Sequence, residues 1–322
     1  MSDTKVSSRK RQLGDRYDGW RVHSNDALFS VIPHVLNNRC DSQVFFDESI
    51  DINELEQFIR NLRRTTTMKD LSTLHVMMAA FVRIISQYPC VNRFICGRKI
   101  YARNKIVFAF NIKKEMKLDA EETCIKVEFF PSDTLWDVYE KVNTAILVNK
   151  EADTQNDTDN IAKLFSFCPS FVVKFVVFLM KKLDAVGLMP KAINEFSPFH
   201  ATLYITDMGS TGLGSVFHHL YNFGTCTLFC CLGKKGRRLK VNDEGKVQYG
   251  RTLNLRFTVD ERVVDGYYYA VTIRELMKLF KHPESLLEKP DCVVPDPGIR
   301  LSRREKRILK KQRKLERQTN AG

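Results

Sequence analysis

Apolar residues recur at helical spacing along three segments of the chain. Residues 51–64 begin with an Asp, and Glu54 follows three residues later, which is the pattern of a capping box at the start of a helix. A second helix is expected over 72–87, because its apolar side chains repeat every three or four residues and a proline follows. A third helix is expected over 134–148, with Asp133 as its cap.

Alternation of apolar and polar residues predicts strands around these helices. The expected strands cover 43–50, 99–101, 105–112, 125–130, 199–206, 225–232, 237–241, 246–249 and 251–259. A turn at 242–245 joins two of them as a hairpin. A short helix is expected at 215–221, after a group of glycines, and a last helix at 267–281. Strands and helices mix throughout, so the predicted class is α/β (α+β), a mixed β-sheet flanked by helices.

One apolar stretch raises the question of a membrane. Residues 164–180 read LFSFCPSFVVKFVVFLM, which at 17 residues is at the short limit for a spanning helix. Pro169 and Lys174 are both unfavourable at the centre of a bilayer. We therefore expect a buried or subunit-packing helix here. An interfacial amphipathic helix is the first alternative, and a transmembrane span is the second.

The positive charge of the chain is concentrated at its ends. Of the formal net charge of +13, residues 300–317 contribute +8 and residues 1–22 contribute +3, which leaves +2 for the body between them. A nucleic-acid-binding body would carry its own basic face, so no nucleic-acid contact through the body is expected. The basic C-terminal tail is expected to be a solvated segment, with anionic lipid, RNA or an acidic partner as alternatives.

Cysteine usage indicates a reducing compartment. Nine cysteines are scattered singly apart from Cys230-Cys231, with no Cys-x-x-Cys pair. The basic start of the chain is not followed by the apolar core of a signal peptide. We therefore expect a cytoplasmic protein. No metal-ligand spacing is present, and no metal is expected.

The heptapeptide at 260–266, Asp-Glu-Arg-Val-Val-Asp-Gly, resembles the signature Asp-His-Arg-x-x-Asp-Gly of the dihydrolipoyl acyltransferases. These are the core enzymes of the 2-oxoacid dehydrogenase complexes and share a fold with chloramphenicol acetyltransferase. The segment 204–209, Tyr-Ile-Thr-Asp-Met-Gly, is similar to the family's Thr-Ile-Ser-Asn-Leu-Gly. The runs 14–19 and 32–34 also look like stand-alone bacterial members of the superfamily. With the order of the elements, the resemblance covers roughly 17–288.

The resemblance implies a chloramphenicol acetyltransferase-like fold and a homotrimer whose active sites lie between subunits. It also implies acyl-CoA or a similar thioester as the acyl donor and a small molecule as the acceptor. A stand-alone member would carry no lipoyl domain and no covalent lipoyl group.

The same resemblance names three candidate catalytic residues. Glu261 stands where the family has the His that deprotonates coenzyme A, and Thr206 stands where a hydroxyl stabilises the oxyanion. Asp265 matches a structural acid that braces the loop of the base, with Arg262 or Arg21 as its expected partner. A carboxylate is a weaker base than an imidazole toward a thiol. Glu261 is therefore either an altered base or a structural or binding carboxylate.

No other histidine has a clear catalytic setting in the sequence. His200 shares a strand face with Thr206 but lies about 20 Å away along it. His34 falls in an early segment interpreted as a strand, and the adjacent His218 and His219 would face different ways on a helix. Each is expected to be a packed or surface residue.

Three regions and three functions follow as expectations. Residues 1–16 are expected to be a disordered basic N-terminus, 17–288 an acyltransferase-like domain with an apolar helical insertion at about 150–196, and 289–322 a basic tail. The leading function is an acyltransferase. The alternatives are a catalytically inactive trimeric binding or scaffold homologue, and a membrane-surface protein that uses residues 164–180 and the basic tail.

Overall fold

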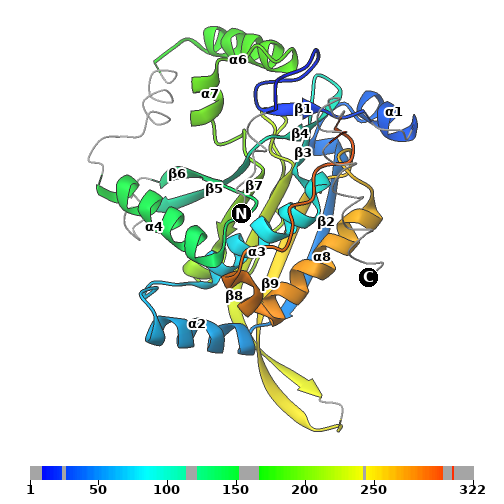
Figure 1. The fold of residues 1–322 in the computed structure, drawn as a ribbon. Helices are drawn as coiled ribbons and strands as arrows, with labels where there is room; N and C mark the ends of the chain where they lie inside the picture. Colours follow the sequence, from blue (N-terminus) through cyan, green and yellow to red (C-terminus); the bar gives the residue numbers. More distant parts are fainter. Residues whose placement is uncertain are drawn as a thin grey trace.

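The computed structural model describes residues 9–23, 27–113, 122–151, 167–241 and 244–299, together with residue 307. Its centre is a mixed sheet in the order β2-β9-β8-β7-β5-β6 (Figure 1). The strands are β2 (Gln43–Asp51), β5 (Ile106–Lys113), β6 (Glu122–Phe129), β7 (Leu203–Asp207), β8 (Leu228–Val241) and β9 (Val247–Asp260). Strand β7 runs parallel to both of its neighbours, and the other pairs are antiparallel. The predicted mixed α/β class is confirmed.

A smaller antiparallel sheet has the order β1-β4-β3. It consists of β1 (Gly19–Arg21), β3 (Arg93–Cys96) and β4 (Lys99–Arg103). Strands β1 and β3 were not expected from the sequence, because three or four residues are too few to establish an alternating pattern. The bridge between Val22 and Ile299 ties residues near the two ends of the described chain together.

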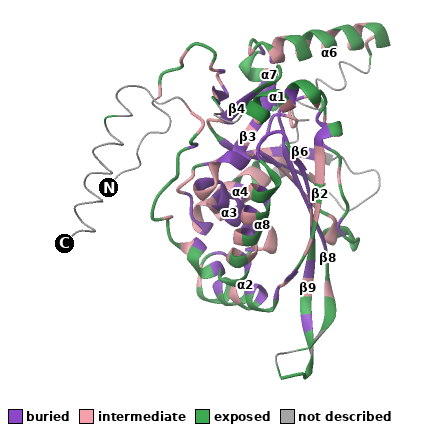
Figure 2. Cartoon of the chain, turned by 90° about the vertical axis from the view of Figure 1, so that its right-hand side faces the viewer, coloured by how far each residue is buried: buried purple, intermediate pink, exposed green. Residues whose placement is uncertain are grey.

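Four helices cover one face of the large sheet, and the main hydrophobic core lies between them and the strands (Figures 1 and 2). They are α2 (Asn53–Thr65), α3 (Thr73–Gln87), α4 (Leu135–Glu151) and α8 (Gly266–Lys281). Helix α3 is nearly surrounded by protein, which explains its long apolar run. The predicted inward side chains of β9 are all buried: Leu253, Leu255, Phe257 and Val259.

Two of the three expected helix starts are wrong in detail. The first turn of α2 follows Ile52, and Asp51 instead accepts a hydrogen bond from the backbone N–H of Asn53. At α4, Thr134 and Asp137 exchange side-chain and backbone hydrogen bonds, while Asp133 pairs with a lysine. A cap depends on backbone angles one residue before the helix, so a shift of one residue changes which side chain reaches the free N–H groups.

The remaining helices lie at one end of the large sheet (Figure 1). They are α1 (Ala27–Val35), α6 (Ser170–Ala185) and α7 (Lys191–Phe196). Short 3-10 turns occur at Cys40–Ser42, Pro89–Asn92, Met208–Thr211 and Pro283–Leu287. Within the described residues, no helix is long and apolar enough to cross a membrane. The sequence-based expectations for 152–166, for the turn residues 242 and 243 and for nearly all of the tail beyond 299 lie outside the described residues.

The expected helix at 215–221 does not form. This segment crosses the second face of the large sheet as an irregular chain between Gly214 and Gly224. Gly224 has φ +86, and a Cβ atom there would come within 2.2 Å of the Phe199 carbonyl oxygen. Contacts to side chains of distant strands set the path of the segment, and local periodicity does not contain that information.

Candidate functional site

Glu261 lies on the turn that follows β9. Its backbone N–H donates to the carbonyl oxygen of Ser42, 3.0 Å away, and its side chain is exposed. The turn is therefore fixed to the start of β2 while the carboxylate remains accessible. A group in this position can bind or deprotonate a molecule that approaches from outside the chain.

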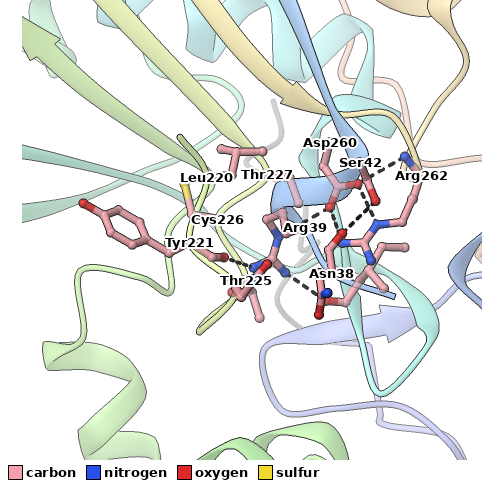
Figure 3. Close-up of polar contacts among 12 residues, drawn as sticks. Asn38, Arg39, Ser42, Leu220, Tyr221, Thr225, Cys226, Thr227, Asp260 and Arg262 are labelled. Atoms are coloured by element: carbon pink, nitrogen blue, oxygen red, sulfur yellow. Dashed lines mark hydrogen bonds and ion pairs between the residues drawn. The ribbon is translucent and has the colours of Figure 1, made fainter. Parts of the chain in front are cut away.

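The turn is braced by a buried cluster of charges around Asp260 (Figure 3). Both oxygens of Asp260 accept hydrogen bonds from the Arg262 guanidinium, at 2.8 and 2.7 Å, and Nε of Arg39 lies 3.4 Å from the same carboxylate. Arg262 also donates to the Leu36 carbonyl oxygen at 3.0 Å. Asp260 has no exposed surface, and the two arginine guanidinium groups compensate the charge of its carboxylate.

Asp265 does not have the partner expected from the resemblance. Its Oδ1 accepts the backbone N–H of Tyr268 at 2.7 Å and caps α8. Arg262 pairs with Asp260 instead, and the guanidinium of Arg21 lies over the ring of Tyr101. A carboxylate directly before a helix is stabilised by the free N–H groups there. The turn that carries Glu261 is therefore held by Asp260, which precedes it, and not by Asp265, which follows it.

Thr206 lies on β7 with a half-buried side chain, and no hydrogen bond engages its hydroxyl within the described part of the chain. The strand register places it opposite Cys231 of β8, which in turn lies opposite Arg256 of β9. Glu261 is five residues beyond Arg256, or about 17 Å along the strand. In a single chain, Glu261 and Thr206 cannot meet at one reacting atom.

The second face of the large sheet, which points away from the four covering helices, carries a row of aromatic rings. Tyr204 and Phe229 are stacked with centroids 5.0 Å apart, and His218 is stacked on Phe229 at 4.1 Å with an interplanar angle of 2°. His218 and His219 also contact each other, at 4.6 Å and 26°. The expectation that these two histidines face different ways is therefore wrong, because the segment is not helical.

Sequence reasoning did not identify this row as a site. The available signal is the density of aromatic and imidazole rings between two glycines, in the run Phe-His-His-Leu-Tyr-Asn-Phe at 217–223. A helix would have spread these side chains around its axis. The extended path instead lays several of them on one surface of the sheet.

The other two histidines considered have different settings. His34 lies exposed near the end of helix α1, not on a strand. His200 is buried before β7 begins, and its ring contacts the Ser197 hydroxyl at 2.8 Å and the Asp184 carboxylate at 3.4 Å. Burial lowers the pKa of His200, against the opposing effect of Asp184. This histidine is part of a structural cluster.

That cluster attaches helix α6 to the body. Arg16 donates to Asp18 at 2.7 Å and to the Asp184 carboxylate of α6 at 2.6 Å, and all three residues are buried. Burial opposes ionisation of Asp184, but the hydrogen bond from His200 and the Arg16 guanidinium outweigh it and hold its pKa below the usual range. Burial also raises the pKa of the neighbouring Cys96 thiol to about 12, so this cysteine is not a nucleophile.

A cavity of about 170 Å³ lies beside the Asp260 brace. Its polar lining includes Arg39, Arg98, Lys181 and Arg262, but neither Glu261 nor Thr206 lines it. Among the described residues, no group of three or more His, Cys, Asp or Glu side chains is arranged to hold a metal ion. The candidate residues from the resemblance thus lie outside this cavity, with Glu261 exposed and Thr206 half-buried.

Comparison with known proteins identifies the fold. No protein-family model and no curated protein sequence matches the chain. Among solved structures, the cubic core of the pyruvate dehydrogenase multienzyme complex matches with a TM-score of 0.52 and 15% identity, over 81% of this chain and 89% of that one.

Two further structures agree with that match. A probable dihydrolipoamide acetyltransferase from Listeria monocytogenes 4b F2365 has a TM-score of 0.51 and 11% identity, over 81% of this chain and 94% of that one. The truncated catalytic core of the 2-oxoacid dehydrogenase multienzyme complex from Thermoplasma acidophilum has a TM-score of 0.50 and 13% identity, over 81% of this chain and 98% of that one. The chain therefore has the fold of the 2-oxoacid dehydrogenase acyltransferase cores, as the signature at 260–266 predicts.

Proposed function

We propose that this chain is an acyltransferase that moves an acyl group from a thioester, such as acyl-CoA, to a small-molecule acceptor. The observation that carries the proposal is the pairing of the acyltransferase fold with two accessible groups, Glu261 and Thr206, at the positions named by the resemblance. Neither side chain makes a hydrogen bond or an ion pair with the described residues.

We further propose that the active form is a homotrimer with each site between two chains. The separation of about 17 Å between the two groups along the sheet requires one of them to come from a neighbouring chain. The second face also exposes apolar side chains that a neighbour would cover, including Phe45, Val216 and Phe217. So does the protruding end of the β8–β9 hairpin, through Leu239, Val241, Val247 and Tyr249 (Figure 1).

The proposed reaction needs one proton transfer and one oxyanion site. The acceptor loses its proton to a base and attacks the thioester carbonyl carbon, whose oxygen becomes an oxyanion and accepts a hydrogen bond from the Thr206 hydroxyl. Collapse of the tetrahedral species then breaks the C–S bond, and the departing thiolate takes up the proton. Glu261 contributes either the base or a carboxylate that binds the acceptor.

Thiol release from a panel of acyl-CoA donors with mixed acceptors tests the proposal. Thr206→Ala is expected to lower kcat about 100- to 1,000-fold, as loss of one oxyanion donor does. Glu261→Gln is expected to lower kcat/KM, and the effect falls on kcat if Glu261 is the base and on KM if it binds the acceptor. Thr252→Ala and Glu128→Gln change matching side chains elsewhere on the large sheet and should leave the rate unchanged.

A wild type that releases no thiol from any donor would overturn the acyltransferase proposal. A gain of activity in Glu261→His would then identify a catalytically inactive homologue whose base was lost. The next measurement in that case would be ligand binding by the assembled protein.

A second candidate function has its own observation. Helix α6 projects at the edge of the molecule (Figure 2) and exposes Phe171, Phe175 and Phe178 at helical spacing. Lys174, Lys181 and Lys182 of this helix are exposed, while its only acidic residue, Asp184, is buried. The lysines share the exposed side of the helix with the phenylalanines, as the contact of Lys182 with the Phe178 ring shows. A helix that exposes apolar and basic side chains together favours the surface of an anionic bilayer. We propose that α6 makes such a contact.

Sedimentation with vesicles of phosphatidylcholine and phosphatidylserine tests the membrane contact. The wild type is expected to bind vesicles that contain phosphatidylserine and to dissociate as salt rises. Phe171→Ser combined with Phe175→Ser should abolish binding, whereas Phe130→Ser, an exposed phenylalanine of the body, should not. Equal binding by both variants would refute a role for α6.

A further inference from the structure

The two ring nitrogens of His218 differ in their hydrogen bonding. Nδ1 lies 2.8 Å from the carbonyl oxygen of His219. A carbonyl oxygen can only accept a hydrogen bond, so Nδ1 must carry the proton when the ring is neutral. Nε2 is then left with its lone pair, and no hydrogen bond engages it within the described residues. A fixed tautomer with a free Nε2 is the state of the imidazole that accepts a proton.

The segment that carries His218 is held at both ends. On one side, Arg256 donates to the Ser215 carbonyl oxygen at 2.6 Å, and the Val216 N–H contacts the Cys231 sulfur at 3.3 Å. On the other side, the Leu220 N–H donates to Gln43 at 2.7 Å, and Arg39 donates to the Tyr221 carbonyl oxygen at 2.7 Å (Figure 3). The ring itself is stacked on Phe229. A base held in this way does not have to be ordered when the substrate arrives.

The His218 ring also lies on the same face of the sheet as the proposed oxyanion residue. His218 is stacked on Phe229, which lies opposite Tyr204 in the strand register. Thr206 is two residues further along the same strand and therefore on the same face, about 7 Å from Tyr204. His218 and Thr206 thus come from one chain and one surface, whereas Glu261 and Thr206 of one chain are far apart along the sheet.

A buried hydroxyl without a partner lies in the same row. Thr258 is opposite Phe229 on β9, is 1% exposed, and its Oγ1 has no hydrogen-bond partner among the described residues. A buried hydroxyl that makes no hydrogen bond destabilises the fold. Thr258 therefore offers an unused hydrogen-bonding group beneath the ring row, next to Phe229.

We propose that His218 is the general base of the acyl transfer. Nε2 takes the proton from the acceptor as the acceptor attacks the thioester carbon, and Thr206 donates to the oxyanion. When the C–S bond breaks, the thiolate recovers the proton from Nε2. The inference rests on the proposed function and leaves Glu261 as a carboxylate that binds the acceptor.

The test compares His218→Asn with His219→Asn in the full chain, measured by thiol release. Asparagine keeps an N–H donor near the position of Nδ1 but has no basic nitrogen, and His219 is the matched neighbour in the same ring row. His218→Asn is expected to lose at least about 100-fold in kcat, while His219→Asn stays near the wild-type rate. Added imidazole should restore activity to His218→Ala, which a purely structural role would not allow.

The outcomes separate the two proposals. Wild-type turnover with an active His218→Asn variant overturns the inference alone. So does an equal loss in both asparagine variants without imidazole rescue, since that pattern indicates a packing role. A wild type that releases no thiol from any donor overturns the proposed function and the inference with it. Unfolding curves of each variant show whether a loss of rate is a loss of fold.

Discussion

Asp260 has two arginines as its charge partners, and all three side chains are buried. Arg39 precedes β2 and Arg262 follows β9, so the cluster joins segments that are far apart in the sequence. Arg39 also reaches the Tyr221 carbonyl oxygen, and this links the turn of Glu261 to the segment of His218. The cluster is therefore the common support of both candidate proton acceptors.

Substitution of Asp260 by Asn should destabilise the fold severely. It would leave two buried guanidinium groups without a compensating charge, a change that costs about 3–5 kcal/mol. Urea unfolding at neutral pH measures the difference. Glu275→Gln breaks an exposed ion pair with Lys278 and is the control, with an expected change below about 0.5 kcal/mol. Similar effects from both variants would contradict the assigned role of the cluster.

Asp184 predicts a dependence of stability on pH. Because its pKa is lower in the folded chain than in the unfolded chain, the unfolded state takes up its proton at a higher pH than the folded state does, and acid therefore favours unfolding. Its contribution is fully present above the ordinary carboxyl pKa of about 3.9 and is lost below it. The difference in unfolding free energy between wild type and Asp184→Asn should therefore shrink between neutral pH and pH of about 3. A constant difference would show that the charge of Asp184 does not contribute.

At the scale of elements, the 215–224 segment depends on tertiary contacts. Its amide and carbonyl groups bond to Cys231 of β8, to Arg256 of β9, and to Arg39 and Gln43 at the start of β2, so three distant parts of the chain hold it. Its end at Gly224 approaches Phe199 too closely for any side chain. The segment therefore has one path across the sheet, and that path sets the direction of the His218 ring.

Two glycines at the ends of this region provide a matched comparison. Gly212 and Gly224 both have positive φ, +79 and +86, but only Gly224 has a neighbour in the way of a Cβ atom. Gly212→Ala is expected to cost about 1–2 kcal/mol, from backbone strain alone. Gly224→Ala should cost clearly more, because the Phe199 carbonyl must also move. Thermal unfolding of the two variants measures this, and equal costs would mean that the segment shifts freely.

At the scale of the whole molecule, the proposed trimer predicts complementation between inactive chains. If each site combines Glu261 of one chain with Thr206 of its neighbour, mixed trimers of Glu261→Gln and Thr206→Ala chains contain one intact site in three. Random reassembly of equal amounts should then recover about a quarter of wild-type activity. Each variant reassembled alone is the control. No recovery in verified mixed trimers would contradict a site that combines Glu261 and Thr206 of neighbouring chains.

The main elements could be predicted from the sequence because the forces behind them are local. The alternation in β9 and the helical spacing in α2, α3 and α8 follow from which side chains must face the core. The signature at 260–266 likewise indicated the acyltransferase fold. Short strands such as β1 and β3, and the start of α2, could not be predicted, because neighbours in space decide them.

At the candidate site, too, part of the arrangement could be predicted from the sequence and part could not. The sequence by itself predicted, through its resemblance to the acyltransferase signature, Glu261 and Thr206 as candidate catalytic residues. Only the tertiary structure decided that Asp260 and not Asp265 braces the turn, that the two groups are far apart in one chain, and that His218 lies on the same face of the sheet as Thr206. Charge pairs and hydrogen bonds between distant segments form only after the strands align, so they leave no periodic pattern in the sequence.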